Sequence, residues 1–245
     1  MAAPARDARY LYVYAIVPAR AEFSLGVRGI DGETVGLVRC GTLAAVAGEV
    51  GEERWFRTPA NLLSHQAVVE AVRAAGETLP ARFGTVLRGE AAVVAALCER
   101  AEQLLEDLAR LGSMVELDLV ILAGSSALRE ESTERAEPLL SGSNIRGAGA
   151  GARYLRGRIR AQAKEQVLEE RMHAAKSLID ESLSAYARDV RWMHLATGRI
   201  AYIAAYLVHP GSVADFRSAY RRLCGERQEF QFMLREPSAP YSFVS

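Results

Sequence analysis

The histidines and cysteines of this chain, which often act in catalysis or bind metals, are few and lie far apart. No two of its histidines stand at the short spacing of paired metal ligands. Ser125 and Ser126 lack the Gly-x-Ser-x-Gly setting of a hydrolase nucleophile. The four histidines are His65, His173, His194 and His209. We therefore predict no catalytic residue, no metal site and no bound cofactor.

A glycine-rich segment, with Gly147, Gly149 and Gly151, precedes a predicted helix. Such segments can bind phosphate through the free N–H groups of the first helical turn. Here no strand comes immediately before the glycines, the third glycine of a dinucleotide-binding motif is misplaced, and no Gly-Lys-Ser/Thr follows. We interpret the segment as a flexible connection into the helix.

Two carboxylates, Glu116 and Asp118, stand two residues apart in a segment that alternates like a strand. Alternate residues of a strand share a face, so the pair could bind a metal or act as an acid and a base. A half-buried strand with one solvent-facing side explains the same alternation without any ligand. We prefer this second interpretation.

Four arginines gather at the start of the longest predicted helix. They are Arg153, Arg156, Arg158 and Arg160. This basic patch is either a solvated helix face or a contact surface for an acidic partner. For the second alternative, we name Arg153, Arg156 and Arg160 as candidate partner-binding residues.

The helix that carries these arginines is predicted over residues 151–190, because apolar residues recur there every three or four positions. At 1.5 Å per residue it would extend on the order of 55 Å. Such a helix covers a sheet with one apolar stripe and then projects, or reaches a partner. The preceding residues, 124–150, are rich in Ser, Glu and Gly and predict a long loop.

Composition narrows the class of protein. The chain has 245 residues, half of them hydrophobic, and its formal net charge is zero. A nucleic-acid-binding protein more often carries a basic excess, so we expect no nucleic-acid partner. No apolar run is long enough to cross a membrane, and no segment resembles a signal peptide.

The three cysteines, Cys40, Cys98 and Cys224, form no disulfide pattern and are interpreted as buried thiols in a reducing cytoplasm.

The first half of the chain predicts an α+β domain over residues 1–111, with helices packed on a largely antiparallel sheet. Thr58 and Pro59 mark a helix start, and His65 on that helix is expected to be a structural residue rather than a ligand. Phe83 is expected to point into the core, with a turn at Gly84. Strands are predicted at residues 10–17, 34–39 and 42–50, an extended segment at 78–87, and helices at 59–75 and 90–111.

The second half, residues 112–245, predicts the order β-α-β-β-α-β of a ferredoxin-like sandwich with a long cover helix. The strands fall at residues 115–123, 191–195, 199–208 and 229–235, and the second helix at 212–225. The terminal residues, 240–245, leave this sheet but carry the apolar side chains of Tyr241 and Phe243. They either pack on the first domain or bind a partner, so Tyr241 and Phe243 join the candidate partner-binding residues.

Eight short segments, taken together and in order, resemble the gas vesicle protein F/L family. The most specific are LPARFGTV at residues 79–86 and PYSFV at residues 240–244. The others are LYVYAIV at 11–17, Gly29-Ile30, LAAV at 43–46, Asn61-Leu62 with His65 and VVE, GARYL at 151–155, and AYLV at 205–208. Residues 236–239 are Glu-Pro-Ser-Ala, where the family commonly has a run containing Gly and Trp.

This resemblance implies two α+β domains, the second ferredoxin-like, and no catalysis. It implies an accessory or minor structural protein of gas vesicles, located at the vesicle within the cytoplasm. Its implied partners are the small hydrophobic shell protein and other accessory proteins, which it contacts during assembly. The alternative is a ligand-binding or haem-type enzyme on tandem ferredoxin-like domains, which would require a histidine or convergent polar groups in a pocket.

Overall fold

The chain folds into mixed helix and sheet and divides into two compact units. The computed structural model describes residues 10–22, 26–51, 58–122, 126–142, 149–197, 200–227 and 230–245. The first unit comprises Met1–Glu116 together with Pro237–Ser245, and the second comprises Leu117–Glu236. This division differs from the sequence-based domains 1–111 and 112–245, chiefly because the last nine residues belong with the first unit.

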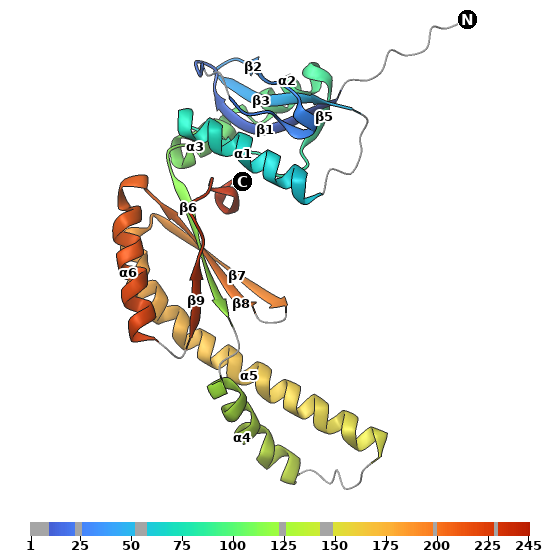
Figure 1. Ribbon diagram of the computed structural model, residues 1–245, viewed down its shortest axis with the longest axis vertical. Coiled ribbons are helices and arrows are strands. Elements are labelled where there is room, and N and C mark those ends of the chain that lie inside the picture. The colour runs from blue at the N-terminus through green and yellow to red at the C-terminus, as the bar shows by residue number, and fades with distance from the viewer. Residues whose placement is uncertain are drawn as a thin grey trace, which may run out of the picture. The chain divides into compact units, whose positions relative to one another are not determined.

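The first unit is built on a sheet in which β1 (Tyr10–Pro18) is central. The strand order is β2-β3-β1-β4, and β5 also pairs with β1. Figure 1 shows β2, β3, β1 and β5 of this sheet. Pairing of β1 with β3 is antiparallel, with a shift in register between Val13 and Ala15. The remaining strands are β2 (Val35–Cys40), β3 (Leu43–Val50), β4 (Leu79–Pro80) and β5 (Val86–Arg88).

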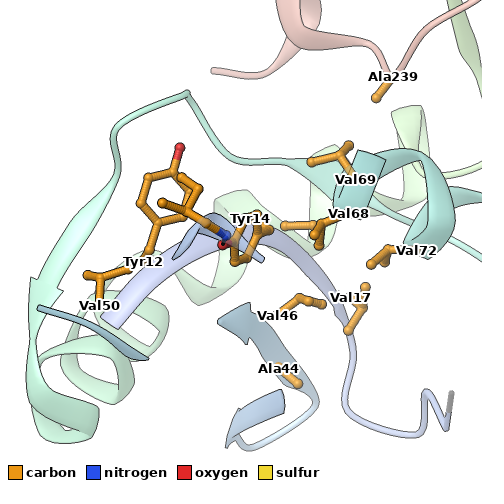
Figure 2. Packing of buried hydrophobic residues seen from close by; sticks show 12 residues of the cluster. Tyr12, Tyr14, Val17, Ala44, Val46, Val50, Val68, Val69, Val72 and Ala239 are labelled. Atoms are coloured by element: carbon orange, nitrogen blue, oxygen red, sulfur yellow. Dashed lines mark hydrogen bonds between the residues drawn. The ribbon is translucent and has the colours of Figure 1, made fainter. Parts of the chain in front are cut away.

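Helices pack on this sheet and bury its side chains. Helix α1 (Pro59–Ala75) is capped at its N-terminus by Thr58, whose side chain accepts a hydrogen bond from the Asn61 N–H, as the sequence predicted. Figure 2 shows Val68, Val69 and Val72 of α1 against the side of the sheet that carries Tyr12 and Tyr14. These buried side chains form the main core of the first unit.

The helix predicted over residues 90–111 is two helices, α2 (Gly89–Glu99) and α3 (Ala101–Leu111). Arg100 separates them, with a non-helical backbone at φ −112° and ψ 18°. The buried positions Val93 and Leu97 in α2 continue into Leu104 in α3 at helical spacing, so the apolar pattern carries no sign of the break.

The prediction of three buried free thiols was wrong. Cys40, at the end of β2, forms a disulfide with Cys98 on α2, and their Cα atoms are 6.5 Å apart. Cys98 is exposed, and Cys40 and the free Cys224 are half-buried. The pairing joins residues 58 positions apart, and only the packing of α2 against the sheet brings them together.

The second unit contains a four-stranded sheet in the order β7-β8-β6-β9. β7 pairs antiparallel with β8, and β6 pairs antiparallel with β9. Its strands are β6 (Val115–Leu122), whose first two residues belong to the first unit, β7 (Asp189–Thr197), β8 (Ile200–Val208) and β9 (Gln231–Leu234). Its helices are α4 (Ser126–Gly142), α5 (Ala150–Leu183) and α6 (Val213–Glu226).

The loop predicted over residues 124–150 was wrong, because most of it is helix α4. The stripe that α4 buries contains the small residues Ser132 and Ala136, which give no apolar period to recognise. Pro138 lies inside the helix and further obscures the pattern. Helix α4 is therefore stabilised by its packing against α5, and its own sequence pattern does not predict it.

The helix predicted over residues 151–190 ends earlier, at Leu183, and a short 3-10 turn, Ser184–Tyr186, follows it. Val190 belongs to β7, which begins at Asp189. Tyr186 follows Leu183 by three residues, and Val190 follows Tyr186 by four. These steps match the spacing of a helix face, so the helix was predicted to continue into what is the first part of β7.

Candidate functional site: a helical hairpin and a docked C-terminal segment

Helices α4 and α5 form an antiparallel hairpin that extends beyond the sheet of the second unit (Figure 1). Arg171 of α5 pairs with Glu131 of α4 at 2.5 Å. Arg135 of α4 pairs with Glu170 of α5 at 2.6 Å, and this hydrogen bond lowers the pKa of the Glu170 carboxyl. Ala163 and Val167 are buried on the facing side of α5. The two helices thus hold each other by ion pairs around a narrow apolar seam.

The far end of this hairpin exposes large apolar side chains. Leu139 near the end of α4 is 53% exposed, and Tyr154 and Leu155 near the start of α5 are 64% and 49% exposed. Because α4 and α5 run antiparallel, the end of α4 and the start of α5, and with them these three residues, lie at the same end of the hairpin. We refer to Leu139, Tyr154 and Leu155 as the hairpin tip. Exposed apolar groups that gather in one place are typical of contact surfaces.

The arginines named from the sequence lie on the same end of α5. Arg153 and Arg160 are exposed, and Arg156 is half-buried. A basic helix surface next to exposed apolar side chains can bind a partner that combines an apolar patch with carboxylates. All three arginines therefore lie in the first three turns of α5, the part of the helix that also carries Tyr154 and Leu155 of the hairpin tip.

The C-terminal segment, Pro237–Ser245, docks within the first unit. Its backbone forms an antiparallel bridge between Ser238 and Glu116, with N–H to O distances of 2.9 and 3.0 Å. Ala239 and Phe243 are completely buried. Figure 2 shows Ala239 near Val69 of α1. The sequence left two alternatives open for Tyr241 and Phe243, packing on the first domain or binding a partner. In the structure, both residues belong to the segment that packs within the first unit.

Carboxylates of the first unit accept hydrogen bonds from this segment. Glu116 accepts two, from the Ser242 N–H at 2.8 Å and from the Ser242 hydroxyl at 2.7 Å. Glu70 accepts from the Ala239 N–H at 3.1 Å, and Asp107 from the Ser245 N–H at 3.2 Å. Glu116 and Asp107 are themselves almost completely buried, so these bonds replace the water that each carboxylate loses.

The interpretation of Glu116 and Asp118 as a solvent-facing pair was wrong. Glu116 is 4% exposed, and Met114 and Val120, which share its side of the strand, are buried as well. Asp118 pairs instead with Arg235 of β9. The alternating pattern in the sequence indicated that one side of this strand faces solvent. In the structure, the docked C-terminal segment covers Glu116 on that side. The residues around Glu116 do not indicate this burial, because Ser242, which covers it, lies 126 residues away in the chain.

His65 lies in a cluster of aromatic rings inside the first unit. Its ring centroid is 5.5 Å from that of Phe83, 5.8 Å from that of Tyr14 and 6.0 Å from that of Tyr241. The Tyr12 hydroxyl lies 3.1 Å from Nδ1 of His65 and accepts a hydrogen bond from the Gly84 N–H at 2.8 Å. Tyr241 of the C-terminal segment thus packs against the same histidine as β1 and the LPARFGTV segment.

Burial fixes the charge states in this cluster. It lowers the pKa of His65 to about 4, with the Ala81 backbone acting in the opposite direction. It raises the pKa of Tyr12 to about 12, and it also raises the pKa of Tyr241. The imidazole is therefore neutral at physiological pH, and its Nδ1 can accept a hydrogen bond from the Tyr12 hydroxyl. His65 is 1% exposed, so its imidazole is not accessible to a substrate, and we interpret its role as structural.

The described residues contain neither a cluster of candidate metal ligands nor a helix that could cross a membrane. No group of three or more His, Cys, Asp and Glu side chains converges as metal ligands among the described residues. Within those same residues, no helix combines the length and apolarity needed to span a bilayer. Gly147 of the glycine-rich segment lies outside the described residues, Gly149 caps α5, and Gly151 lies in its first turn.

The family model described as "Gas vesicle synthesis protein GvpL/GvpF" matches residues 10–245. The chain belongs to this family. Gas vesicle protein F of Streptomyces sp. (strain CB03234) is 28% identical over 95% of this chain and 98% of its own length. Gas vesicle protein L of the same strain is 27% identical over 96% of this chain and 93% of its own length.

A solved structure shows the same fold. The crystal structure of gas vesicle protein GvpF from Microcystis aeruginosa has a TM-score of 0.78, with 20% sequence identity. The match covers 96% of this chain and 99% of the crystallised one. The matched relatives are named as gas vesicle proteins, not as enzymes.

Proposed function

We propose that this member of the GvpL/GvpF family is an accessory or minor structural protein of gas vesicles. It binds the shell protein and other accessory proteins while the vesicle assembles, and it resides at the vesicle within the cytoplasm. Membership over residues 10–245 supports the gas vesicle role. We propose further that it has no catalytic activity, in keeping with relatives that are named as gas vesicle proteins and not as enzymes.

The observation that carries the binding proposal is the exposed hairpin tip. The two helices of the hairpin pack against each other and form ion pairs along their contact. The tip residues remain exposed: Leu139, Tyr154 and Leu155. The resemblance to the family implies a small hydrophobic shell protein as a partner, and an apolar contact would suit such a partner. Arg153 and Arg160 next to the tip would select a partner face that also carries carboxylates.

The second unit supports this role as a scaffold, and we propose that it is a ferredoxin-like sandwich. Chain order β6-α5-β7-β8-α6-β9 and sheet order β7-β8-β6-β9 favour that assignment. In this arrangement α4 is an insertion between the first strand and its helix, paired with an extension of α5. The insertion creates the projecting hairpin and presents its tip away from the sheet.

Co-purification tests the proposal. Tagged wild-type protein is captured from vesicle-forming cells, together with Leu155→Ser/Tyr154→Ser and Arg153→Ala/Arg160→Ala variants. We expect wild type to recover the shell protein and both variants to recover several-fold less, because the apolar and the basic parts of the surface are each weakened. Arg221→Ala/Arg222→Ala on α6, also an exposed pair, is the matched charge control and should bind like wild type. Equal recovery by all variants would refute the hairpin tip as the contact.

A further inference from the structure

An apolar pocket of about 440 Å³ lies in the first unit, between the sheet and α2, and opens to solvent. Apolar side chains of β1, β3 and α2 form its walls. They are Val13, Ile16, Ala45, Val93, Ala96 and Leu97. The volume is within the range of pockets that hold small molecules, roughly 300–1,000 Å³. The pocket is therefore large enough for a ligand with an apolar body.

Four of the segments that carry the family resemblance meet at this pocket. They are LYVYAIV, LAAV, LPARFGTV and PYSFV, and each contributes at least one residue to the lining. Packing of the core accounts for the buried members of these segments. It does not account for Arg82 of LPARFGTV, which lines the pocket and is exposed.

The charged residues in the lining of this pocket are both arginines, Arg82 and Arg100. Arg100 donates a hydrogen bond to the Ser245 backbone oxygen at 2.9 Å. The side chain of Arg82 has no hydrogen-bond or ion-pair partner within the described residues. A guanidinium carries five N–H donors, so both arginines can still donate to an anion. The charge of the lining therefore favours a ligand with a negative group.

The backbone of Arg82 is held firmly beside the pocket. Thr85 donates to the Arg82 carbonyl oxygen twice, from its N–H at 3.1 Å and from its hydroxyl at 2.7 Å. The Ala81 N–H donates to the Tyr14 carbonyl oxygen, and the Val13 N–H to the Thr85 carbonyl oxygen, both at 2.9 Å. The guanidinium thus extends from a fixed position, which reduces the ordering cost of binding.

We propose that this pocket binds a medium-chain aliphatic carboxylate. The alkyl chain lies against the apolar walls between the sheet and α2, and the carboxylate binds Arg82 and Arg100. Burial of the chain supplies most of the affinity, because each CH2 removed from water adds a similar increment. The two arginines select the sign of the charge, because an amine would meet like charges there. The pocket lies in the first unit and the hairpin tip in the second, so the two sites are tested separately.

Titration calorimetry of the full chain with hexanoate, octanoate and decanoate, each below its critical micelle concentration, tests the pocket. We expect saturable binding at one site. The Kd should fall roughly tenfold for every two carbons added, while the chain still fits the pocket. Absence of saturable decanoate binding, or an affinity that does not depend on chain length, would overturn the proposal.

Paired variants locate the ligand. Ala96→Leu fills the pocket and should weaken decanoate binding at least tenfold, whereas Ala95→Leu, on the exposed side of the same helix, should bind like wild type. Arg82→Gln should weaken decanoate binding about two- to fivefold. It should leave unchanged the binding of decan-1-ol, which has the same chain and no charge. Arg88→Gln, an exposed arginine outside the lining, should change neither affinity.

Each pair of variants can contradict the proposal. Decanoate binding that survives in Ala96→Leu would place the acid at a different site. Equal losses of decanoate and decan-1-ol in Arg82→Gln would show that the guanidinium does not recognise the carboxylate. Arg82 is exposed, so its replacement should leave the fold intact, and the charge test remains decisive even if Ala96→Leu does not fold.

Discussion

Glu116 holds Ser242 by two hydrogen bonds, at 2.8 Å to its N–H and at 2.7 Å to its hydroxyl, although 126 residues separate them. Glu116 lies on β6, at the end of the first segment of the first unit, and Ser242 lies in the segment that returns to it. One buried carboxylate thus joins the two parts of the chain from which the unit is made.

Glu116→Gln should destabilise the first unit. A neutral amide keeps one acceptor oxygen for the Ser242 N–H, and its NH2 group can only donate to the Ser242 hydroxyl, so both hydrogen bonds lose their charged acceptor inside the protein. Hydrogen bonds to charged groups contribute about 1.5–3 kcal/mol each, and urea unfolding should show a loss of that order. Glu102→Gln on the exposed side of α3 is the control and should change the free energy of unfolding by less than about 0.5 kcal/mol. Equal stabilities of the two variants would contradict a structural role for this carboxylate.

The buried His65 makes stability depend on pH in the acid range. Its pKa is about 4 in the folded protein and about 6.5 when unfolded. Between these values the unfolded chain binds a proton that the folded protein does not, so the contribution of His65 is fully present above about pH 6.5. It is lost as the pH falls toward 4, by at most about 1.4 kcal/mol per pH unit.

The difference between two histidine variants isolates this contribution. His65→Gln keeps a polar group near Tyr12 but cannot take up the proton, so its unfolding free energy should fall less steeply between about pH 6.5 and pH 4. His173→Gln, on the exposed surface of α5, should follow the wild-type pH dependence. Denaturant unfolding at several pH values measures both. Parallel curves for wild type and His65→Gln would show that His65 is not held neutral.

Gly29→Ala should disturb the core through Tyr14. A Cβ at residue 29 would lie 2.4 Å from the Tyr14 hydroxyl oxygen, which accepts a hydrogen bond from the Ile30 N–H at 2.7 Å. The ring must shift or the bond must break, and overpacking of this kind costs about 1–3 kcal/mol. Gly36→Ala in β2 meets nothing within 4 Å and is the matched control. Thermal unfolding should separate the two, and a Gly29→Ala variant as stable as Gly36→Ala would contradict the close approach.

Local sequence patterns predicted the elements whose causes are local. The helix from Pro59 to Ala75 follows from its cap at Thr58 and from the glycine that stops it. The extended LPARFGTV segment forms β4 and β5 with a turn at Gly84, whose φ is 91°. Phe83 packs on the core as expected but is only partly buried there.

What the sequence did not predict depends on distant partners. Helix α4 shows no apolar period because it buries small residues against α5, and the Cys40–Cys98 pairing needs α2 on the sheet. Glu116 resembled a solvent-facing residue because its cover comes from the other end of the chain. The exposure of the hairpin tip likewise follows from a helix pair that the pattern did not reveal.

The most direct test of this account is the melting temperature of protein that lacks residues 240–245. The account places these residues in the core of the first unit, where Phe243 is completely buried, so the truncated protein should melt well below wild type. Loss of a buried phenylalanine alone costs about 3–5 kcal/mol. A truncated protein that melts like wild type, and that no longer captures the shell protein, would contradict the account and make the segment a partner-binding element.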